Sequence, residues 1–495
     1  MPSGGAEARS NAMAELSVHI HSLMTQPQLG DLFAKAEEEN LSVEQSAVLR
    51  EMKRDWQQAN LLPESLVQAQ SLAGSKCEHA WRTQRGNNDW QGFEKNWAEV
   101  VTLSREEAQI RAEAKGVSAY DAMLDIYEPG TTTASLDQLF SDVKTWLPSM
   151  IDQAIEKQAS GQIQLPNGHY PAEKQKALGL DVMKLLQFDF EHGRLDESVH
   201  PFCGGVPSDV RITTRYDEKE FVQSLMGIVH ETGHARYEQG LPKAFAGTSA
   251  GQARSMGIHE SQSLFFEMQL GRSPAFVEHL AQLATNYFQG DEFKTDNLAK
   301  IYTRVEKGYI RVDADELTYP AHVILRYEIE RDLMNGVIKH TDVPELWNEK
   351  MKSYLGLTTE GNYKNGCMQD IHWTDGKRTV ISPSQTTDKK EKRLKKHNYK
   401  DGCMQDIHWC DGSFGYFPSY TLGAMYAAQF MASMKNTVDV DGAIQAGDLS
   451  PIFAWLSDNI WSKGSLLTTD ELVTQATGET LNPLHFQNHL RNRYL

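Results

Sequence analysis

Hydrophobic residues recur every three or four positions along most of the chain, between charged and polar residues, and this spacing is typical of amphipathic helices. Gly, Pro and Asn interrupt the pattern and mark the joints between helices. The pattern predicts helical segments at residues 13–60, 84–116, 134–160, 275–307, 320–338, 421–435 and 466–491. Strand patterns are few, and the clearest is the alternating segment Asp209–Tyr216. The chain is therefore predicted to be mainly α-helical with a small β component.

A further helix is predicted directly after this strand. Asp217 and Glu220 are interpreted as a capping pair at its start, and hydrophobic residues follow at helical spacing from Phe221. Gly240 is expected to end the helix, with Pro242 just beyond.

This predicted helix contains the sequence His-Glu-Thr-Gly-His at positions 230 to 234. Two histidines four positions apart lie on one face of a helix, so His230 and His234 can bind one zinc ion. The carboxylate of Glu231 would lie beside the open coordination position and act as general base on a water molecule. The alternative is a helix with two surface or core histidines and no metal.

A catalytic zinc site of this kind needs a third protein ligand. Glu238, Glu260 and Glu267 are carboxylates nearby in the sequence, and the residues alone do not choose among them. Glu260 and Glu267 belong to a second predicted helix that ends at Gly271. The strand Asp209–Tyr216 would allow a peptide to pair along a sheet edge above the metal, although a purely structural strand is the alternative.

Length and composition narrow the class of protein. A chain of 495 residues can form two subdomains around a cleft or one large helical body. With 49 Lys and Arg against 67 Asp and Glu, the net charge of −18 argues against nucleic acid and anionic membranes as partners. The five cysteines form no Cys-x-x-Cys pair, and the start of the chain lacks the apolar core of a signal peptide. A cytoplasmic location is therefore expected.

One unit of the sequence occurs twice. Residues 362–376 recur almost unchanged at 398–412, an offset of 36 positions (398 − 362 = 36). Two copies are too few for a solenoid, and the basic run between them predicts a solvated loop. We interpret residues 363–398 as a local duplication inserted as a loop; a basic patch that recruits a partner is the alternative.

The motifs, taken together, resemble those of a known family. They are His200-Pro-Phe, Asp209-x-Arg211-x-Thr213, His230-Glu231-x-x-His234, His259-Glu260-Ser-Gln, Ile310-Arg311-x-x-Ala314-Asp315 and Gly402-x-x-Gln405-Asp406-x-His408-Trp409. This ordered set, which spans nearly the whole chain, is similar to that of the thermostable carboxypeptidase Taq family of metallopeptidases. The resemblance implies a mainly α, saddle-like body with a deep groove, a small β-sheet beside the zinc helix, and a homodimer. It also implies that residues 1–495 form a single catalytic domain that acts on peptides and binds one Zn²⁺ per chain, with Co²⁺ or Mn²⁺ as substitutes.

The resemblance also implies roles for individual residues. Glu260 is expected to be the third metal ligand, and His408 and Tyr420 to stabilise the tetrahedral oxyanion ahead of Tyr416, which would contact substrate or simply pack. Arg311 is expected to bind the substrate's C-terminal carboxylate, because a guanidinium can bind both oxygens. An ion pair of Arg311 with Asp313 or Asp315 is the alternative. The groups expected to support the site from behind its ligands are Asp209, Arg211, Thr213, His200, Gln405 and Asp406. Arg211 is the alternative carboxylate-binding residue, and His259 is expected behind the ligands or facing substrate.

Two departures from the family pattern concern this chain. First, the family's N-terminal helical stretch is shortened, so the chain looks truncated. Second, the unit that contains Gln405, Asp406 and His408 occurs twice, and only its second copy runs directly into the segment that ends at Tyr420. The function predicted from the sequence is a metal-dependent carboxypeptidase that removes C-terminal residues with broad specificity. A zinc oligopeptide endopeptidase and a catalytically silent peptide-binding homologue are the alternatives.

Overall fold

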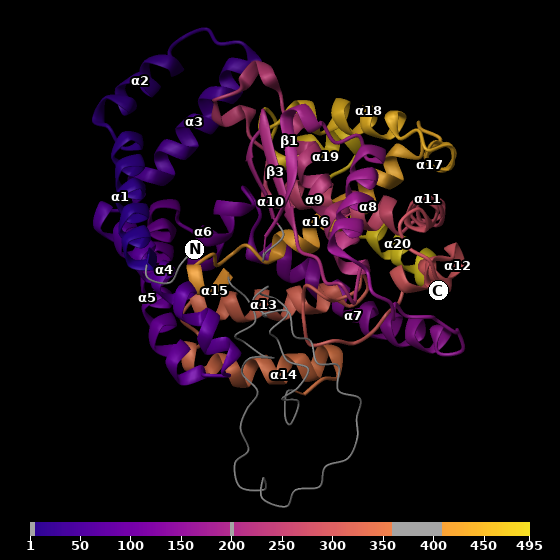
Figure 1. The fold of residues 1–495 in the computed structure, drawn as a ribbon. Helices are drawn as coiled ribbons and strands as arrows, with labels where there is room; N and C mark the ends of the chain where they lie inside the picture. The colour runs from indigo at the N-terminus through magenta and orange to yellow at the C-terminus, as the bar shows by residue number, and fades with distance from the viewer. Residues whose placement is uncertain (1–4, 199–201, 359–407) are drawn as a thin grey trace, which may run out of the picture.

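The computed structural model describes residues 5–198, 202–358 and 408–495. Within them the protein is mainly helical, which confirms the predicted fold class, and a small sheet lies beside the helices (Figure 1). The helices are α1 (Ala6–Met24), α2 (Pro27–Glu37), α3 (Val43–Leu61), α4 (Glu64–Gly86), α5 (Trp90–Lys115), α6 (Ala119–Tyr127), α7 (Thr133–Gln158), α8 (Ala172–Leu185), α9 (Val222–Gly240), α10 (Met256–Leu264), α11 (Pro274–Thr285), α12 (Thr295–Tyr302), α13 (Tyr319–Met334), α14 (Val343–Leu355), α15 (His408–Asp411), α16 (Pro418–Met434), α17 (Val440–Ala446), α18 (Ser450–Asn459), α19 (Thr469–Thr477) and α20 (Leu484–Tyr494). The strands are β1 (Gly193–Glu197), β2 (Phe202–Val206) and β3 (Asp209–Thr214).

Local breaks divide several of the predicted helical segments. Pro27 occupies the first position of α2, and Ser42 forms a capping box with Gln45 at the start of α3, so the segment predicted at 13–60 forms three helices. Asn88 has a left-handed backbone (φ 55°) between α4 and α5, which separates these two helices. Single helices occupy the segments predicted at 134–160, 320–338 and 421–435.

The small sheet has the strand order β1-β3-β2, with β1 parallel and β2 antiparallel to β3. The predicted strand at 209–216 is therefore β3, and it lies in the centre of the sheet with both edges hydrogen-bonded to neighbouring strands. The hypothesis that a peptide pairs along this strand is wrong for that reason. Strand β2 is an outer strand of the sheet. Its residues Phe202 and Cys203 line the cavity that also contains His230 and His234 of α9.

Strand β3 packs against α9 through its hydrophobic face. Val210 and Ile212 are buried with Ile228 and Ala235 of the helix in one cluster. Because successive strand residues face opposite sides, Asp209 and Arg211 lie on the other face, where they form an ion pair of 2.6 Å with side chains about half exposed (50% and 52%). The interpretation that this pair supports the metal helix is therefore corrected: hydrophobic packing holds α9.

Helix α10 is held tightly between α9 and α16. A Cβ atom added to Gly233 of α9 would lie 2.5 Å from the carbonyl oxygen of Gln262, and one added to Gly423 of α16 would lie 2.8 Å from Cβ of Glu260. Both approaches require glycine, because a side chain at either position would force the helices apart. The two glycines thus fix the distance between α9 and the helix that carries Glu260.

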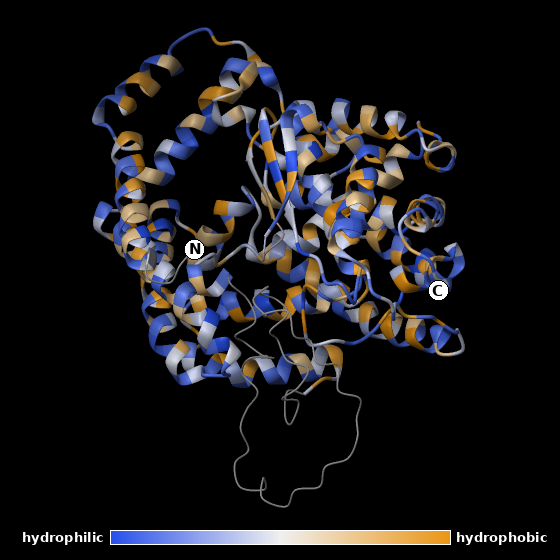
Figure 2. Ribbon diagram, in the orientation of Figure 1, coloured by the Kyte–Doolittle hydropathy of each residue, from blue (hydrophilic) through white to orange (hydrophobic). Residues whose placement is uncertain are grey.

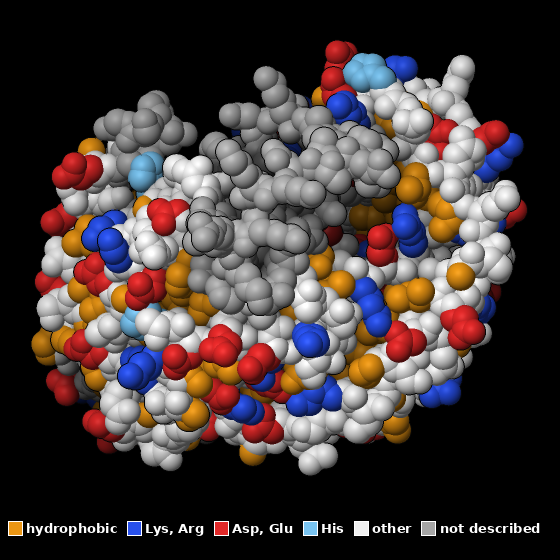
Figure 3. Space-filling model, turned by 90° about the horizontal axis from the view of Figure 1, so that it is seen from below, with side chains coloured by type: hydrophobic (Ala, Val, Ile, Leu, Met, Phe, Trp, Pro, Cys, Tyr) orange, Lys and Arg blue, Asp and Glu red, His pale blue; other side chains and the backbone are white. Residues whose placement is uncertain are grey.

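The surface carries a mixture of charges and scattered hydrophobic groups. Figure 3 shows acidic and basic side chains interspersed over one face of the molecule. Figure 2 shows hydrophobic and hydrophilic residues alternating along the helices, as expected for amphipathic helices packed around a core. Among the described residues, no helix has both the length and the hydropathy needed to cross a bilayer.

Candidate metal centre

Helix α9 begins one turn later than Asp217 and ends where predicted. The carboxylate of Glu220 accepts hydrogen bonds from the backbone N–H groups of Val222 (2.7 Å) and Gln223 (3.0 Å), so Glu220 alone caps the first turn. Asp217 instead pairs with Glu220 in an isolated β-bridge. The last residue of the helix is Gly240, as the sequence predicts.

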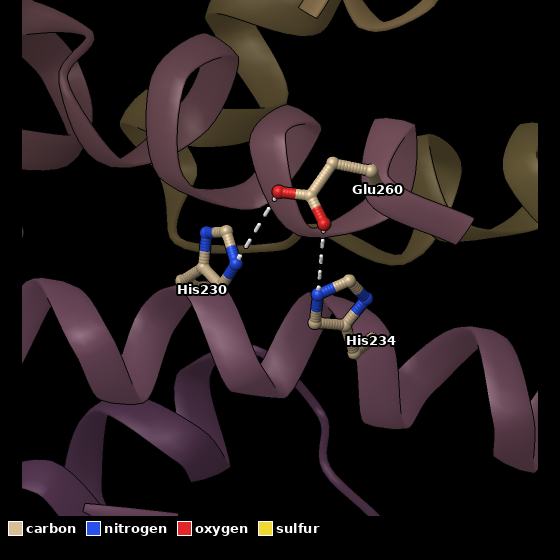
Figure 4. A group of neighbouring side chains, drawn as sticks. All are labelled: His230, His234 and Glu260. Carbon is tan, nitrogen blue, oxygen red and sulfur yellow. Dashed lines mark ion pairs between the residues drawn. The ribbon is translucent and has the colours of Figure 1, made fainter. Parts of the chain in front are cut away.

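The two histidines of α9 and Glu260 of α10 converge on one point (Figure 4). The distance from His230 Nε2 to Glu260 Oε1 is 3.7 Å, and that from His234 Nε2 to Glu260 Oε2 is 3.4 Å. Of the three carboxylates that the sequence left open, the structure therefore brings Glu260 to the histidines' ε nitrogens. The other two, Glu238 and Glu267, lie behind the histidines.

The separations suit a small divalent cation. In a tetrahedral site with metal–ligand distances of about 2.0 to 2.1 Å, neighbouring ligand atoms lie roughly 3.3 Å apart. The observed 3.4 and 3.7 Å approach this length, and all three ligand atoms lie within 4.8 Å of one another. Three protein ligands leave a coordination position for water or substrate, which is the arrangement of a catalytic metal site.

Behind His230 lies an ionic pair from the next helical segment. Helix α10 continues without a break into a π-helix, η5 (Phe265–Gly271), and Glu267 of this segment lies 2.9 Å from His230 Nδ1. Arg272 donates a hydrogen bond of 2.5 Å to the other oxygen of Glu267. Burial alone would raise the pKa of Glu267, but the charge of Arg272 and the hydrogen bond with His230 lower it to about 2. Glu267 is therefore an ionised acceptor that orients His230.

Behind His234 lies a chain of two further groups. His259 Nδ1 is 2.6 Å from His234 Nδ1, and His259 Nε2 is 2.8 Å from Glu238 Oε1. If His234 presents its Nε2 lone pair to a cation, its Nδ1 must carry the proton and donate it to His259. His259 then carries its own proton on Nε2 and donates to Glu238. One tautomer of each ring satisfies the whole chain, and His259 is placed behind the ligand as the sequence predicts.

Three carboxylates and two imidazoles shape the electrostatics of the centre. Burial opposes protonation of His230, but Glu267 and Glu260 outweigh it and raise the pKa of His230 to about 9. Burial raises the pKa of Glu231 to about 7, with further increases from the charges of Glu260 and Glu267. Three carboxylates around two imidazoles attract a cation, and this electrostatic environment agrees with the geometry.

One cavity of about 770 Å³ joins the metal centre to the other predicted site residues. Its lining includes every such residue in the described chain that was assigned a metal, catalytic or substrate role: His230, Glu231, His234, Glu260, Arg311, His408, Tyr416 and Tyr420. These residues come from segments almost 200 positions apart, so their convergence is a property of the fold. Arg211 is not part of this lining.

Helix α15 and the chain from Tyr416 into α16 contribute an imidazole and two phenols to the same cavity. His408 Nε2 lies 3.1 Å from the hydroxyl of Tyr420. The ring of Tyr416 stands between those of His408 and Tyr127, with centroid distances of 5.2 Å to each. Burial raises the pKa of Tyr416 well above its usual range, so its phenol stays protonated and can donate a hydrogen bond.

Arg311 is buried in the wall of the same cavity, with only 5% of its surface exposed. Its Nη1 donates a hydrogen bond of 2.9 Å to the hydroxyl of Tyr319, and its guanidinium lies 4.7 Å from the ring centre of Tyr420. Asp315, one of the predicted ion-pair partners, accepts hydrogen bonds from backbone N–H groups of its own loop. Asp313, the other, accepts one of 2.8 Å from Gln223 of α9.

Some functional groups were missed by sequence reasoning, and some predictions fall outside the described chain. Arg272 and Tyr319 belong to none of the motifs, and only the structure shows their contacts, with Glu267 five positions away and with Arg311 eight positions away. Thr213 accepts a hydrogen bond of 3.1 Å from the N–H of Phe202 and so links β2 to β3. The residues His200, Gln405 and Asp406, together with the duplicated segment 363–398, lie outside the described residues.

Comparisons with known proteins agree with the geometry. The family model described as carboxypeptidase Taq (M32) metallopeptidase matches residues 1–378 and 389–494. The chain is 33% identical to carboxypeptidase 1 of Bacillus subtilis and 34% identical to thermostable carboxypeptidase 1 of Thermus thermophilus, over 100% of this chain and 92% of each relative. Among solved structures, metallocarboxypeptidase 1 of Trypanosoma cruzi is 46% identical with a TM-score of 0.89, and a carboxypeptidase of Pyrococcus furiosus is 30% identical with a TM-score of 0.87. Each comparison covers 100% of this chain and 93% of the other. The chain therefore belongs to the carboxypeptidase Taq (M32) family of metallopeptidases.

Proposed function

We propose that the protein is a zinc-dependent carboxypeptidase that removes single residues from the free C-terminus of peptides. The observation that carries this proposal is the shared cavity, in which a three-ligand metal site, a buried carboxylate and a buried arginine face the same space. The ligand set of two imidazoles and one carboxylate suits zinc, with cobalt or manganese as substitutes. Peptides, as the family implies, are the substrates.

Glu231 and the aromatic segment would perform the proton transfers and stabilise the developing charge. When bound, the cation polarises the substrate's carbonyl group and makes a water molecule more acidic. Glu231, beside His230 on α9, accepts the proton of that water and passes it to the leaving amine. The imidazole of His408 and the phenol of Tyr420, 3.1 Å apart, would donate to the tetrahedral oxyanion.

Arg311 would distinguish an exopeptidase from an endopeptidase. An arginine with only 5% of its surface exposed, in a cavity wall, binds a carboxylate more strongly than a surface arginine does, because water competes less for it. A free C-terminus supplies that carboxylate, whereas an internal peptide bond does not. The complete ligand set and the buried Glu231 argue against the silent peptide-binding homologue.

The decisive experiment combines metal removal with a matched pair of peptides. The protein is stripped with a chelator, reloaded separately with Zn²⁺, Co²⁺ or Mn²⁺, and assayed on one tripeptide with a free C-terminus and on the same tripeptide with a C-terminal amide. We expect activity only after reloading and only on the free peptide. Equal cleavage of the amide would support the endopeptidase, and inactivity of every fully loaded form would support the silent homologue.

The glutamate is tested with a variant that preserves its shape. Glu231→Gln should keep the metal, because it is not a ligand, and should lower kcat by about 10² to 10⁴. Metal content measured by elemental analysis is the control. Size-exclusion chromatography with light scattering would test the homodimer, which stays a prediction, as does the cytoplasmic location.

A further inference from the structure

The cavity face of α9 has a gap in its row of side chains. Gln223, Gly227, His230 and His234 follow one another at four, three and four positions, so they lie within an arc of about 60° on the helix. All four line the cavity. Between the long side chains of Gln223 and His230, Gly227 contributes only backbone, and a Cβ atom added there would meet no heavy atom within 4 Å. We call this opening the Gly227 notch.

The notch lies between the metal centre and the loop that carries Arg311. On one side, His230 follows Gly227 by three residues, about 4.5 Å along the helix axis. On the other side, Gln223 donates a hydrogen bond of 2.8 Å to Asp313, and this contact fixes the Arg311 loop over the N-terminal part of α9. A peptide bound with its scissile bond at the metal and its terminal carboxylate at Arg311 would place the side chain of its last residue beside Gly227.

Hydrophobic side chains line the same cavity, and two of its arginines are paired with carboxylates. Met268, Ile301 and Tyr302 contribute to the lining. Arg272 pairs with Glu267 at 2.5 Å, and Arg304 pairs with Glu306 at 2.8 Å. A side chain entering the notch would therefore meet open space, with hydrophobic groups among the residues of the surrounding lining.

We propose that Gly227 sets the size of the C-terminal residue that the enzyme releases, and that the notch accepts large hydrophobic or aromatic side chains. This inference rests on the proposed carboxypeptidase activity and adds a specificity-determining position to it. Glycine is otherwise unfavourable inside a helix, so its presence at an unobstructed position agrees with a need for space.

The test is a graded series at Gly227 against a graded series of substrates. Wild type, Gly227→Ala, Gly227→Val and Gly227→Leu are assayed on N-blocked dipeptides that share one first residue and end in Ala, Leu, Phe or Trp. Each added carbon in a hydrophobic pocket changes kcat/KM by about 10-fold or more. We expect kcat/KM for the Phe and Trp peptides to fall about 10-fold in Gly227→Ala and further in the larger variants, while that for the Ala peptide changes little.

Folding and metal content separate a specificity effect from damage. Gly227→Ala should raise the Tm, since alanine is the better helix former and meets no obstacle. Equal losses of kcat/KM on all four peptides would overturn the inference. A second series of dipeptides keeps the last residue constant and varies the first. A loss of kcat/KM that depends on the size of the first residue would also overturn the inference. Wild type that releases no residue from any free peptide would instead refute the proposed function, so the two failures are distinguishable.

Discussion

Replacing Gly233 with alanine should weaken metal binding although none of the ligands changes. An added Cβ would lie 2.5 Å from the carbonyl oxygen of Gln262 and 2.7 Å from Cα of Ser263. Both are backbone atoms of α10, so neither can rotate away. Ordinary contact begins near 3.4 Å, and α9 and α10 would have to separate by about 0.9 Å (3.4 − 2.5) at this point.

That displacement is large compared with the tolerance of a metal site. The histidine ligands lie on α9 and Glu260 lies on α10, so separating the helices lengthens the 3.4 and 3.7 Å distances that hold the site together. Metal–ligand distances vary by only about 0.2 Å among intact sites. We expect zinc affinity to fall about 10- to 100-fold, the range seen when supporting groups are lost, and stability to fall by about 1–3 kcal/mol from overpacking.

The assay is competition for zinc with a chromophoric chelator, combined with thermal unfolding of the metal-free and metal-loaded proteins. Gly227→Ala is the matched control, because it makes the same substitution on the same helix at a position with nothing within 4 Å. The control should bind zinc as tightly as wild type. If Gly233→Ala also keeps wild-type affinity, the close approach of the two helices does not set the geometry of the metal site.

Three further variants test two groups of the site and one buried carboxyl group outside it, Glu128, which accepts a hydrogen bond of 2.7 Å from Ser419 of α16. Arg311→Ala should lower kcat/KM for peptides with a free C-terminus by about 10- to 100-fold, since a charge-assisted hydrogen bond contributes about 1.5–3 kcal/mol. Steady-state kinetics on free and amidated peptides will show whether the loss is confined to the free peptides. Equal losses on both would reject the carboxylate-binding role. Glu267→Gln should weaken zinc binding about 10- to 100-fold by removing the anionic partner of His230; unchanged affinity in chelator competition would show that the pair is not needed. Burial raises the pKa of Glu128 from 4.5 to about 7, so the folded state holds a proton that the unfolded chain has released, and the free energy of unfolding should fall by up to roughly 3 kcal/mol as the pH rises through this interval. Denaturant unfolding at several pH values should show a flatter dependence for Glu128→Gln, and curves parallel to wild type would contradict the assignment.

Features that depend on residues close together in the sequence were predicted best. The end of α9 at Gly240 and the shared face of His230 and His234 depend only on neighbouring residues and helical periodicity. The division of residues 13–60 into three helices also has local causes, Pro27 at the start of α2 and the capping box of Ser42 at the start of α3, although the hydrophobic spacing concealed them. Periodicity therefore located helices better than it located their joints.

Long-range features needed either the family resemblance or the structure. Glu260 could not be separated from Glu238 and Glu267 by spacing, because the choice depends on how α10 crosses α9. Asp209 and Arg211 were misplaced by the resemblance, whereas the alternation of β3 already puts them on the face opposite Val210. The order of the sheet was not predictable, since β1 and β2 are short and carry no clear alternating pattern.

The wide turns of η5 have a consequence for which sequence changes the protein can tolerate. A π-helix arises when one extra residue is accommodated within a helix, so removing a single residue between Phe265 and Gly271 would restore regular α geometry. Because the wide turn accommodates the extra residue, the groups beyond such a deletion would keep nearly their present phase, whereas a deletion in a regular α-helix would rotate them by about 100°. A residue of this segment other than Glu267 could therefore be lost with less disturbance than one from the regular turns of α9, where a deletion between His230 and His234 would turn the second ligand away from the first.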